Sequence, residues 1–402
     1  MNSRLSQIVI KFQRQALKTI TNQQKYTYQF RLQINIVFSS KIIVMTQNKS
    51  VFLETHNIKN RTSGLGTFNY ELIKGLESLP LDNLNLYLNS DNPSKLKSEF
   101  GDKFNYHRYI GAHRYKHLRP FKKYDLWHSV NQNSKIEPRF DSKYLLTIHD
   151  VNFVEEISSD MNHKKNVAFI EKLKKATAIT YISEFAKKQT HQYFNVPTIP
   201  EYIIHNGNPI STILDTSTFV SNIPTDKPFL YSIGDFLERK NFLSVVKMMK
   251  HLTDFNLILS GNSNKPYGIE IARFIQENNL QNRVFLTGKV SDIAKQFYLS
   301  KCHAFVFPSI REGFGLPPIE AMHFGKPVFL SNKTSLPEVG GKHAYYWDNF
   351  DPEYMKETLI EGLNHFYNNK TEMELLMKER AASFNWKVAA AEYLKVYEKC
   401  LF

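Results

Sequence analysis

The chain has 402 residues, more than one ordinary hydrophobic core accommodates, and this length favours two domains. Hydrophobic residues make up 42% and charged residues 22%, a balance typical of globular rather than disordered proteins. No run approaches eighteen consecutive apolar residues, so we expect no transmembrane helix. The two cysteines, Cys302 and Cys400, are too few for a disulfide framework and lie in no metal-binding pattern, which favours a reducing compartment.

The net charge of +14 is unevenly distributed along the chain. Residues 1–44 contain seven Lys or Arg and no Asp or Glu, so this segment supplies half of the excess. The remaining +7 is modest and fits several kinds of anionic partner. Residues 1–44 also differ from the rest of the chain, and three interpretations stay open: an upstream start miscalled in an AT-rich gene, an acid-free targeting segment, or a basic arm that contacts a membrane.

From Met45 onward, segments typical of strands alternate with segments typical of helices. In the first series we expect strands at 51–55, 83–88, 104–110, 124–130, 143–151, 178–183 and 202–207. Helices are expected in this series at 67–79, 165–176 and 184–194. In the second series we expect strands at 228–234, 255–261, 283–288, 303–309 and 327–332, and helices at 241–252, 269–279, 293–299, 354–367, 372–384 and 386–401.

Residues 209–227 separate the two series and are rich in Pro, Ser and Thr, as a linker would be. Two consecutive βα series predict an α/β protein with two doubly wound, Rossmann-like parallel-sheet domains that face each other across a cleft. We expect an N-terminal domain at 45–213 and a C-terminal domain at 222–385. The helix at 386–402 is expected to pack back on the N-terminal domain.

Ligands of such sheets bind where strands end and helices begin, and several polar or glycine-rich segments occupy these places. Gly64 and Gly66 stand just before the expected helix at 67–79. His149 and Asp150 follow "KYLLTI" at the end of the fifth expected strand. For these residues a turn, a cap or a buried imidazole is the structural alternative to a ligand site.

The segment "GDFLERKN", which follows "PFLYSI" of the first strand in the second series, contains Gly234, Arg239 and Lys240. Two cations at the start of a helix oppose the helix dipole, which suggests that something anionic lies nearby. A solvated helix start is the alternative.

The most informative stretch is "SIREGFGLPPIEAMHFGKPV", residues 309–328, in which seven residues separate Glu312 from Glu320. Its two prolines suit the first turn of a helix, and the backbone N–H groups of Gly313, Phe314 and Gly315 could bind an anion or sugar oxygens. Glu320 could accept the hydroxyls of a ribose, as acids do in dinucleotide sites, or it could merely complement the helix dipole.

These motifs together resemble those of glycosyltransferase family 4, whose retaining enzymes have the two-domain GT-B fold. The resemblance rests on "EGFGLPPIEAMHFGKPVFLSNKTSLPEV", "GDFLERKN", "TIHDV", "YISEFAKK" and "SGLGTFNYEL", which occur in the family's order and cover about residues 45–400. One departure is Asp235, because some members carry a basic residue directly after the glycine of this motif.

The resemblance implies roles for individual residues. Glu320 would hold the ribose, and Glu312 with the backbone of Gly313, Phe314, Gly315 and Leu316 would address the sugar and the diphosphate. Arg239 and Lys240, beside Gly234, would neutralise the leaving diphosphate, and His149 would reach the donor sugar. Gly64 or Gly66 would approach a phosphate or the acceptor. The family generally has no accepted protein nucleophile, and we name none.

The function implied is that of a retaining hexosyltransferase, mannosyltransferase-like, that moves a sugar from a GDP- or UDP-linked donor to a glycan or lipid-linked acceptor in cell-surface polysaccharide synthesis. We expect no metal and no cofactor, because two cations and a helix N-terminus can stabilise the leaving group and no acid pair of the Asp-x-Asp kind follows a strand. The alternatives are a non-catalytic basic binding or scaffold protein of GT-B fold, or a GT-B sugar-nucleotide epimerase.

The acceptor side is less determined. Residues 106–125 interleave His, Arg, Lys and aromatic side chains, which suits either a solvated face or a surface for lipid-linked or anionic acceptors. No nucleic-acid module is recognisable. We expect a cytoplasmic protein, with peripheral contact to an anionic membrane at the inner face of the plasma membrane as an alternative.

Overall fold

The computed structural model describes residues 48–402, so the three interpretations of residues 1–44 lie outside the described residues. Within them the chain forms two β-sheets, and both are parallel throughout. The first sheet has seven strands in the spatial order β3-β2-β1-β4-β5-β6-β7. Its strands are β1 (Lys49–Leu53), β2 (Leu84–Ser90), β3 (Asn105–Arg108), β4 (Leu126–Ser129), β5 (Lys143–Ile148), β6 (Ala178–Tyr181) and β7 (Glu201–Ile203).

The second sheet has six strands in the order β10-β9-β8-β11-β12-β13. Its strands are β8 (Phe229–Ile233), β9 (Asn256–Ser260), β10 (Val284–Gly288), β11 (Ala304–Phe307), β12 (Val328–Ser331) and β13 (Tyr345–Trp347). The part of the chain that contains β1–β7 is called the N-terminal half below, and the part that contains β8–β13 the C-terminal half. The expected architecture of two doubly wound parallel sheets, the GT-B fold, is confirmed.

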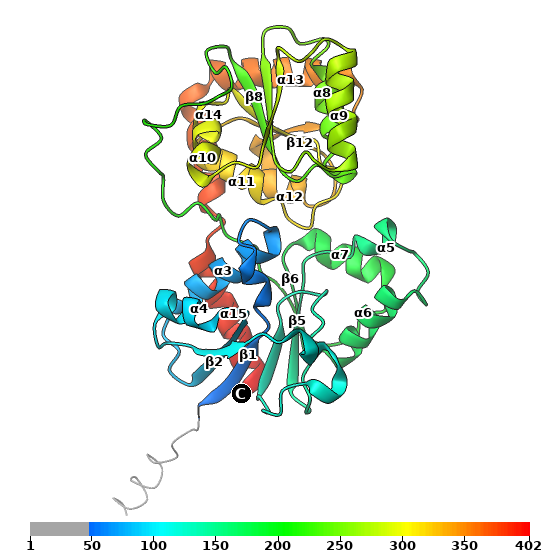
Figure 1. Cartoon of the computed structure of the whole chain (residues 1–402), viewed down its shortest axis with the longest axis vertical. Coiled ribbons are helices and arrows are strands. Elements are labelled where there is room, and N and C mark those ends of the chain that lie inside the picture. Colours follow the sequence, from blue (N-terminus) through cyan, green and yellow to red (C-terminus); the bar gives the residue numbers. More distant parts are fainter. Residues whose placement is uncertain (1–47) are drawn as a thin grey trace, which may run out of the picture. The chain divides into compact units, whose positions relative to one another are not determined.

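Helices connect these strands in both halves (Figure 1). In the N-terminal half they are α3 (Gly64–Glu77), α4 (Pro93–Phe100), α5 (Phe153–Glu156), α6 (Lys164–Lys175) and α7 (Glu184–Tyr193). Later in the chain come α8 (Phe242–Met248), α9 (Pro266–Glu277), α10 (Asp292–Lys301), α11 (Leu316–His323), α12 (Leu336–Gly340), α13 (Pro352–Asn368), α14 (Lys370–Ala382) and α15 (Trp386–Leu401). The sequence pattern did not predict α4, α5, α12 or β13, which are short and lack a clear period.

The strand orders define a topological switch point in each sheet. In the first sheet the connections reverse direction between β1 and β4, and in the second sheet between β8 and β11. Ligands of open α/β sheets bind outside the carboxyl ends of the strands at such points. The segments after β8 and β11, which contain Arg239, Lys240 and Glu312, therefore lie where a ligand site is expected.

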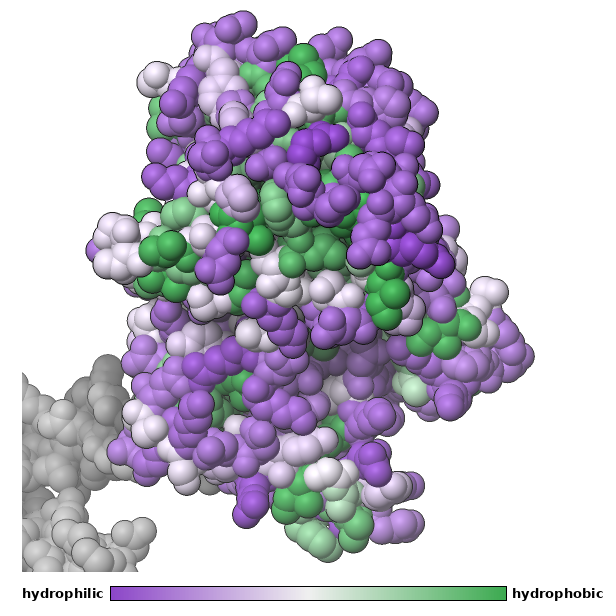
Figure 2. Space-filling view, turned by 45° about the horizontal axis from the view of Figure 1, so that its top comes forward, coloured by the Kyte–Doolittle hydropathy of each residue, from purple (hydrophilic) through white to green (hydrophobic). Residues whose placement is uncertain are grey.

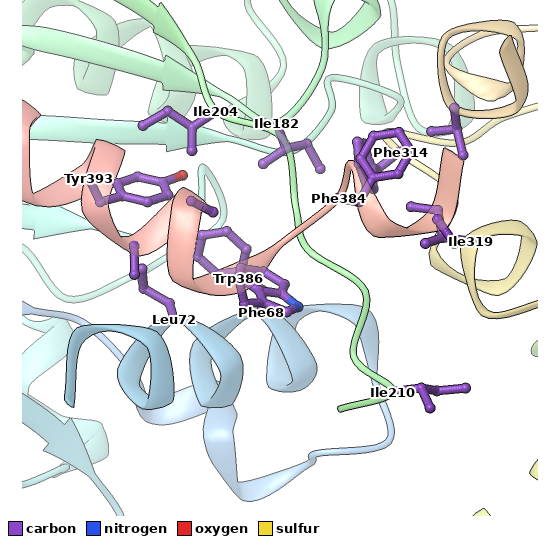
Figure 3. Packing of buried hydrophobic residues seen from close by; sticks show 14 of the residues in the cluster. Phe68, Leu72, Ile182, Ile204, Ile210, Phe314, Ile319, Phe384, Trp386 and Tyr393 are labelled. Carbon is purple, nitrogen blue, oxygen red and sulfur yellow. The ribbon is translucent and has the colours of Figure 1, made fainter. Parts of the chain in front are cut away.

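The last helix, α15, packs against α3 of the N-terminal half, far from its own neighbours in sequence (Figures 1 and 3). The approach is close, because a Cβ at Gly75 would lie 2.6 Å from the Cβ of Ala390. Phe68 of α3 meets Trp386 and Tyr393 of α15, with ring centroids 5.6 and 6.1 Å apart. The helix thus fills the outer layer of a sheet to which it is not adjacent in the chain.

A buried polar group fixes the register of α15 on the sheet. His128 of β4 is fully buried, and its ring nitrogens contact the Tyr397 hydroxyl at 2.9 Å and the Thr147 hydroxyl at 2.7 Å. Burial lowers the pKa of His128 to about 3, so its imidazole is neutral at physiological pH. A neutral ring can donate from one nitrogen and accept at the other, which satisfies both contacts without burying a charge.

One apolar cluster contains residues of both halves. Phe314, just before α11, packs against Phe384, with ring centroids 5.5 Å apart, and Phe384 precedes α15. Figure 3 shows how the residues of α3 and α15 and those around Phe314 belong to this cluster. Residues Lys49–Phe402 accordingly form a single contact unit.

The outer surface is mostly polar. On the face shown in Figure 2, hydrophilic residues predominate and hydrophobic residues form smaller groups among them. Across residues 48–402, every helix is too short or too polar to span a bilayer.

Candidate active site

A cavity of about 250 Å³ lies between the carboxyl ends of the two sheets. The C-terminal half contributes Arg239, Glu312 and Gly313. The lining residues from the N-terminal half are Asn133, Asp150, Asn152, Phe153, Glu156 and Lys165. Charged and amide side chains from both halves therefore converge on one small space, as they do in binding sites for polar ligands.

Glu312 is the centre of a buried ionic cluster beside this cavity. Its Oε1 lies 2.5 Å from the Lys240 Nζ and accepts a hydrogen bond of 2.6 Å from the Ser309 hydroxyl. Its Oε2 lies 3.5 Å from Nη1 of Arg239. Glu312 and Lys240 are only 9% and 8% exposed, so their pairing takes place almost entirely out of water. The anion that the two adjacent cations suggested is thus Glu312 itself.

Burial and charge act on the two partners in different ways. Burial alone would raise the pKa of Glu312, but Lys240, Arg239 and the Ser309 hydroxyl more than offset it and hold the pKa below its usual value. Burial lowers the pKa of Lys240, against the opposing effect of Glu312. The pair stays ionised at neutral pH because each charge compensates the other.

Local backbone features place these side chains. Asn241 has φ 53°, in the left-handed region that asparagine tolerates, and it turns the chain from the 3₁₀ turn Glu238–Lys240 into α8. The backbone N–H of Ile310 donates a hydrogen bond of 2.8 Å to the carbonyl of Arg239. The segments after β8 and β11 are therefore tied to each other by backbone as well as by charge.

Gly313 brings the two halves into contact. A Cβ at this position would lie 2.2 Å from the carbonyl oxygen of His149, a distance that excludes any side chain. The Ser183 hydroxyl donates a hydrogen bond of 2.6 Å to the Gly313 carbonyl. The loop after β11 thus rests directly on the ends of β5 and β6.

His149 is buried, and its Nε2 lies 2.9 Å from the carbonyl oxygen of Val130, to which it donates. Its ring packs edge-on against Phe68, with ring centroids 4.6 Å apart. Burial lowers the pKa of His149 to about 4, so the imidazole is neutral. Because Nε2 carries the proton, Nδ1 is a hydrogen-bond acceptor, and it has no partner among the described residues.

Asp150 caps its own turn, because its Oδ1 accepts the backbone N–H of Asn152 at 3.1 Å. The same carboxyl lines the cavity, and burial raises its pKa. The structural and the ligand-binding interpretation of Asp150 are therefore compatible.

Glu320 lies on α11, away from the cavity lining, and is only 7% exposed. Its carboxylate oxygens lie 3.2 and 3.3 Å from the Nζ of Lys295 on α10. Burial raises the pKa of Glu320, and Lys295 opposes this shift. No sequence feature singled out Lys295, which sits in an ordinary amphipathic helix pattern.

The remaining candidate residues of these two segments, Gly234, Phe314, Gly315 and Leu316, do not line the cavity. Gly315 has φ 124°, a conformation that only glycine adopts readily, and it caps α11, of which Leu316 is the first residue. Phe314 is buried, and its carbonyl accepts the Ser335 hydroxyl at 2.6 Å. A Cβ on Gly234 would lie 3.5 Å from Cε of Lys240, so Gly234 packs against the lysine stem.

The prediction that Gly64 and Gly66 precede their helix is wrong. Helix α3 begins at Gly64, because the Ser63 side chain accepts the N–H of Gly66 and caps the helix three residues earlier than expected. Gly66 is required for packing, since a Cβ there would lie 1.8 Å from the carbonyl oxygen of Asn60. Neither glycine lines the cavity described above.

Glu338 of α12 makes a second contact between the halves that the sequence did not reveal. Its carboxylate accepts the backbone N–H of Glu184 at 2.8 Å and that of Phe185 at 3.2 Å, both in the first turn of α7. It also lies 2.7 Å from Nε2 of His205. A carboxylate at a helix N-terminus is stabilised by the free N–H groups, which here belong to the other half.

Among residues 48–402, no three His, Cys, Asp or Glu side chains are grouped so that they could hold a metal ion.

Comparisons with known proteins agree with this geometry. Residues 215–384 match the family model described as "Glycosyl transferases group 1". The chain is 23% identical to O-antigen chain mannosyltransferase B of Escherichia coli, over 87% of this chain and 99% of that protein. It is 27% identical to O-antigen chain mannosyltransferase RfbU of Salmonella typhimurium, over 54% of this chain and 60% of that protein.

Solved structures share the fold. Sucrose-phosphate synthase from Thermosynechococcus elongatus superposes with a TM-score of 0.67 at 19% identity, over 87% of this chain and 98% of that chain. The Anabaena protein HepE, in complex with UDP and glucose, superposes with a TM-score of 0.62 at 14% identity, over 87% of this chain and 99% of that chain.

Two doubly wound sheets with a polar, charged cavity between their carboxyl ends are the arrangement of the GT-B fold. More particularly, residues 215–384, which match the group 1 glycosyltransferases, include the segments after β8 and β11 that build the ionic cluster, and this match supports a glycosyltransferase.

Replacing Lys240 by Met should reverse the pH dependence of stability near the cluster. In the native protein Glu312 has a lowered pKa, so the unfolded chain binds more protons and the pair stabilises the fold above about pH 4.3 and less as the pH falls. Without the ammonium, burial should raise the pKa of Glu312, and stability should then decrease as the pH rises. At pH 7 we expect a loss of about 3–5 kcal/mol.

Urea unfolding between about pH 3 and pH 8, roughly the range over which carboxylates and histidines titrate, measures both effects. Lys247→Met is the matched control, because Lys247 is exposed on α8. Equal pH profiles for Lys240→Met and Lys247→Met would mean that the cluster does not contribute to stability as described.

Replacing Glu338 by Ala should loosen the contact between the halves, because the N–H groups of Glu184 and Phe185 lose their acceptor. We expect kcat/KM for the sugar donor to fall by about tenfold or more, with each lost charge-assisted hydrogen bond worth about 1.5–3 kcal/mol. The kcat/KM of Glu338→Gln, which keeps one acceptor oxygen, should lie between those of the wild type and Glu338→Ala. The exposed Glu361→Ala is the control, and kinetics equal to the control would refute the positioning role.

Proposed function

We propose that this group 1 glycosyltransferase moves mannose or a related hexose from a GDP- or UDP-linked donor to a glycan or lipid-linked acceptor, with retention of configuration and without a metal. The observation that carries the proposal is the cavity at the two switch points, where Arg239 and the Glu312–Gly313 loop face polar residues of the other half. Mannosyl transfer in cell-surface polysaccharide synthesis is supported by the O-antigen mannosyltransferases among its relatives.

The nucleotide would bind along α11. Glu320 is buried and held by Lys295 alone among the cations of the described residues, so its oxygens keep lone pairs for the ribose hydroxyls. The N-terminus of α11, reached through Gly315, would face the diphosphate, as helix N-termini do in other phosphate sites. A donor site of this kind is supported by the Anabaena protein HepE, which shares the fold and was solved in complex with UDP and glucose.

Charge stabilisation is the main chemical task. The bond between the anomeric carbon and the diphosphate oxygen would break with the electron pair on the diphosphate, while the acceptor hydroxyl would bond to the same carbon and pass its proton to the departing diphosphate oxygen. Arg239, which lines the cavity, and Lys240 behind it would stabilise the departing diphosphate. Glu312 holds both cations in place before the donor arrives, so little reorganisation is needed.

His149 and Asp150 would act from the N-terminal half. The neutral His149 ring can accept a hydrogen bond from a sugar hydroxyl at Nδ1. The contact of Gly313 with the His149 carbonyl keeps this imidazole within reach of the donor-binding loop. The protein would work in the cytoplasm, with peripheral contact to an anionic membrane where the acceptor is lipid-linked.

Release of nucleoside diphosphate from a panel of GDP- and UDP-sugars by the purified chain tests the proposal. We expect turnover with one GDP- or UDP-hexose, a product with the donor's anomeric configuration, and an unchanged rate in EDTA. Failure with all donors would favour a scaffold, and an isomerised sugar nucleotide would favour an epimerase. A loss of turnover in EDTA that Mg²⁺ or Mn²⁺ restores would contradict metal independence.

Substitutions of Glu312 and Glu320 should change the donor kinetics in different ways. Glu320→Gln should raise the donor KM about tenfold or more with little change in kcat, because the ribose is remote from the reacting bond and contributes uniform binding. Glu312→Gln should chiefly lower kcat, since it also releases Lys240 and Arg239 from their positions. Donor kinetics and titration with the nucleoside diphosphate separate the two effects.

Asp292→Asn is the matched control for Glu320→Gln, because Asp292 is 85% exposed and lies 3.7 Å from the same lysine, Lys295. Equal weakening of diphosphate binding by Glu312→Gln and Glu320→Gln would show that the roles are not separate.

A further inference from the structure

The docking loop, residues 110–123, differs from the rest of the described surface. Its exposed apolar side chains are Ile110, Tyr115, Leu118 and Phe121, which are 45%, 56%, 55% and 76% exposed. These four are among the sixteen large apolar side chains that are exposed in residues 48–402, and Phe140, 40% exposed, adds a fifth close by in the fold. Large apolar groups in water are costly unless another phase or partner covers them.

The same loop is strongly basic. Arg114, Lys116, Arg119, Lys122 and Lys123 lie within it, and no Asp or Glu occurs from Lys103 to Tyr124. The other cluster of exposed apolar residues, at 213–220, contains an aspartate and no Lys or Arg. Of these two clusters, only the docking loop combines apolar and cationic side chains on one surface.

The docking loop is held in shape by the segment after β4. Arg139 donates to the carbonyl of His117 at 3.1 Å, and its guanidinium lies 3.6 Å from the centre of the Phe121 ring. Arg119 donates in return to the carbonyl of Pro138, also at 3.1 Å. The apolar side chains are therefore presented by a braced surface that does not bury them.

The segment after β4 also links the docking loop to the active site. A hollow of about 160 Å³ lies beside the loop and is lined by Arg108, His113, Phe121, Lys122 and, from the segment after β4, Ile136. Three residues earlier in that segment, Asn133 lines the active-site cavity. The segment that holds the docking loop in shape therefore also reaches the active-site cavity.

We propose that the docking loop binds the surface of an anionic lipid bilayer, with Leu118 and Phe121 inserted among the headgroups and the basic side chains on the lipid phosphates. A bilayer surface would cover both the apolar and the cationic side chains of the docking loop. A polyanion in water would contact the cations alone and leave the apolar groups exposed. The proposal deepens the proposed function by naming the membrane surface that an enzyme with a lipid-linked acceptor contacts.

Co-sedimentation of the full chain with phosphatidylcholine vesicles, with and without phosphatidylglycerol, tests the proposal. We expect binding to the vesicles that contain phosphatidylglycerol and a decrease with added salt. The double variant Lys122→Gln, Lys123→Gln should bind about thirtyfold more weakly, at about fivefold for each cation. The double variant Leu118→Ser, Phe121→Ser should bind these vesicles at least about tenfold more weakly.

The double variant Val220→Ser, Ile269→Ser is the matched control, because these side chains are 83% and 63% exposed outside the docking loop. All variants keep residues 1–44, so that the basic N-terminal segment contributes equally. Thermal unfolding verifies that each variant is folded.

The proposal would be overturned if the wild-type protein did not bind the vesicles, or if the docking-loop variants bound them as the control does. So would a loss confined to the lysine variant, which would indicate an anionic polymer in place of a bilayer. Vesicle binding needs no sugar donor, so a chain that binds vesicles but transfers no sugar would contradict the proposed function alone.

Discussion

The contact of Gly313 with the carbonyl of His149 is the constraint on which the site depends. Any side chain at position 313 would place its Cβ 2.2 Å from that oxygen, so the two halves could not approach as they do. The approach places Glu312 and Arg239 opposite the acids and amides that follow β5. Ser183 and Glu338 then hold the approach with hydrogen bonds to the loop and to the first turn of α7. Neither half alone has the arrangement of charged and amide side chains that lines the cavity, and this arrangement depends on the close contact at Gly313.

Burial also determines how the ionic cluster around Glu312 acts. Removing Lys240 and Glu312 from water is expensive, and a pair of this kind contributes little net stability compared with apolar side chains. Its value lies in orientation: two cations are held at the switch point of the second sheet before any ligand binds. A preorganised charge needs no solvent rearrangement when negative charge develops on a leaving group. The same residues therefore contribute less to stability than well-packed apolar side chains would, and they are the basis of the proposed chemistry.

The segment after β4 connects three features that the chain order keeps apart. Asn133 lines the active-site cavity, Ile136 lines the smaller hollow, and Arg139 braces the docking loop. One segment of the N-terminal half thus contributes to the active-site cavity, to the smaller hollow and to the support of the docking loop. An acceptor with a polar sugar end and an anionic lipid end would match this sequence of surfaces.

The sequence by itself determined the two parallel sheets and the candidate residues at their strand ends, because both follow from local periodicity and from the position of the glycine loops. It could not show that Lys295 holds Glu320 or that Glu338 caps α7, since these contacts join residues 25 and about 150 positions apart. It also misplaced the start of α3, where one hydrogen bond from the Gly66 N–H to the Ser63 side chain decides the boundary. Such pairs depend on how whole elements pack, and only the tertiary structure sets that packing.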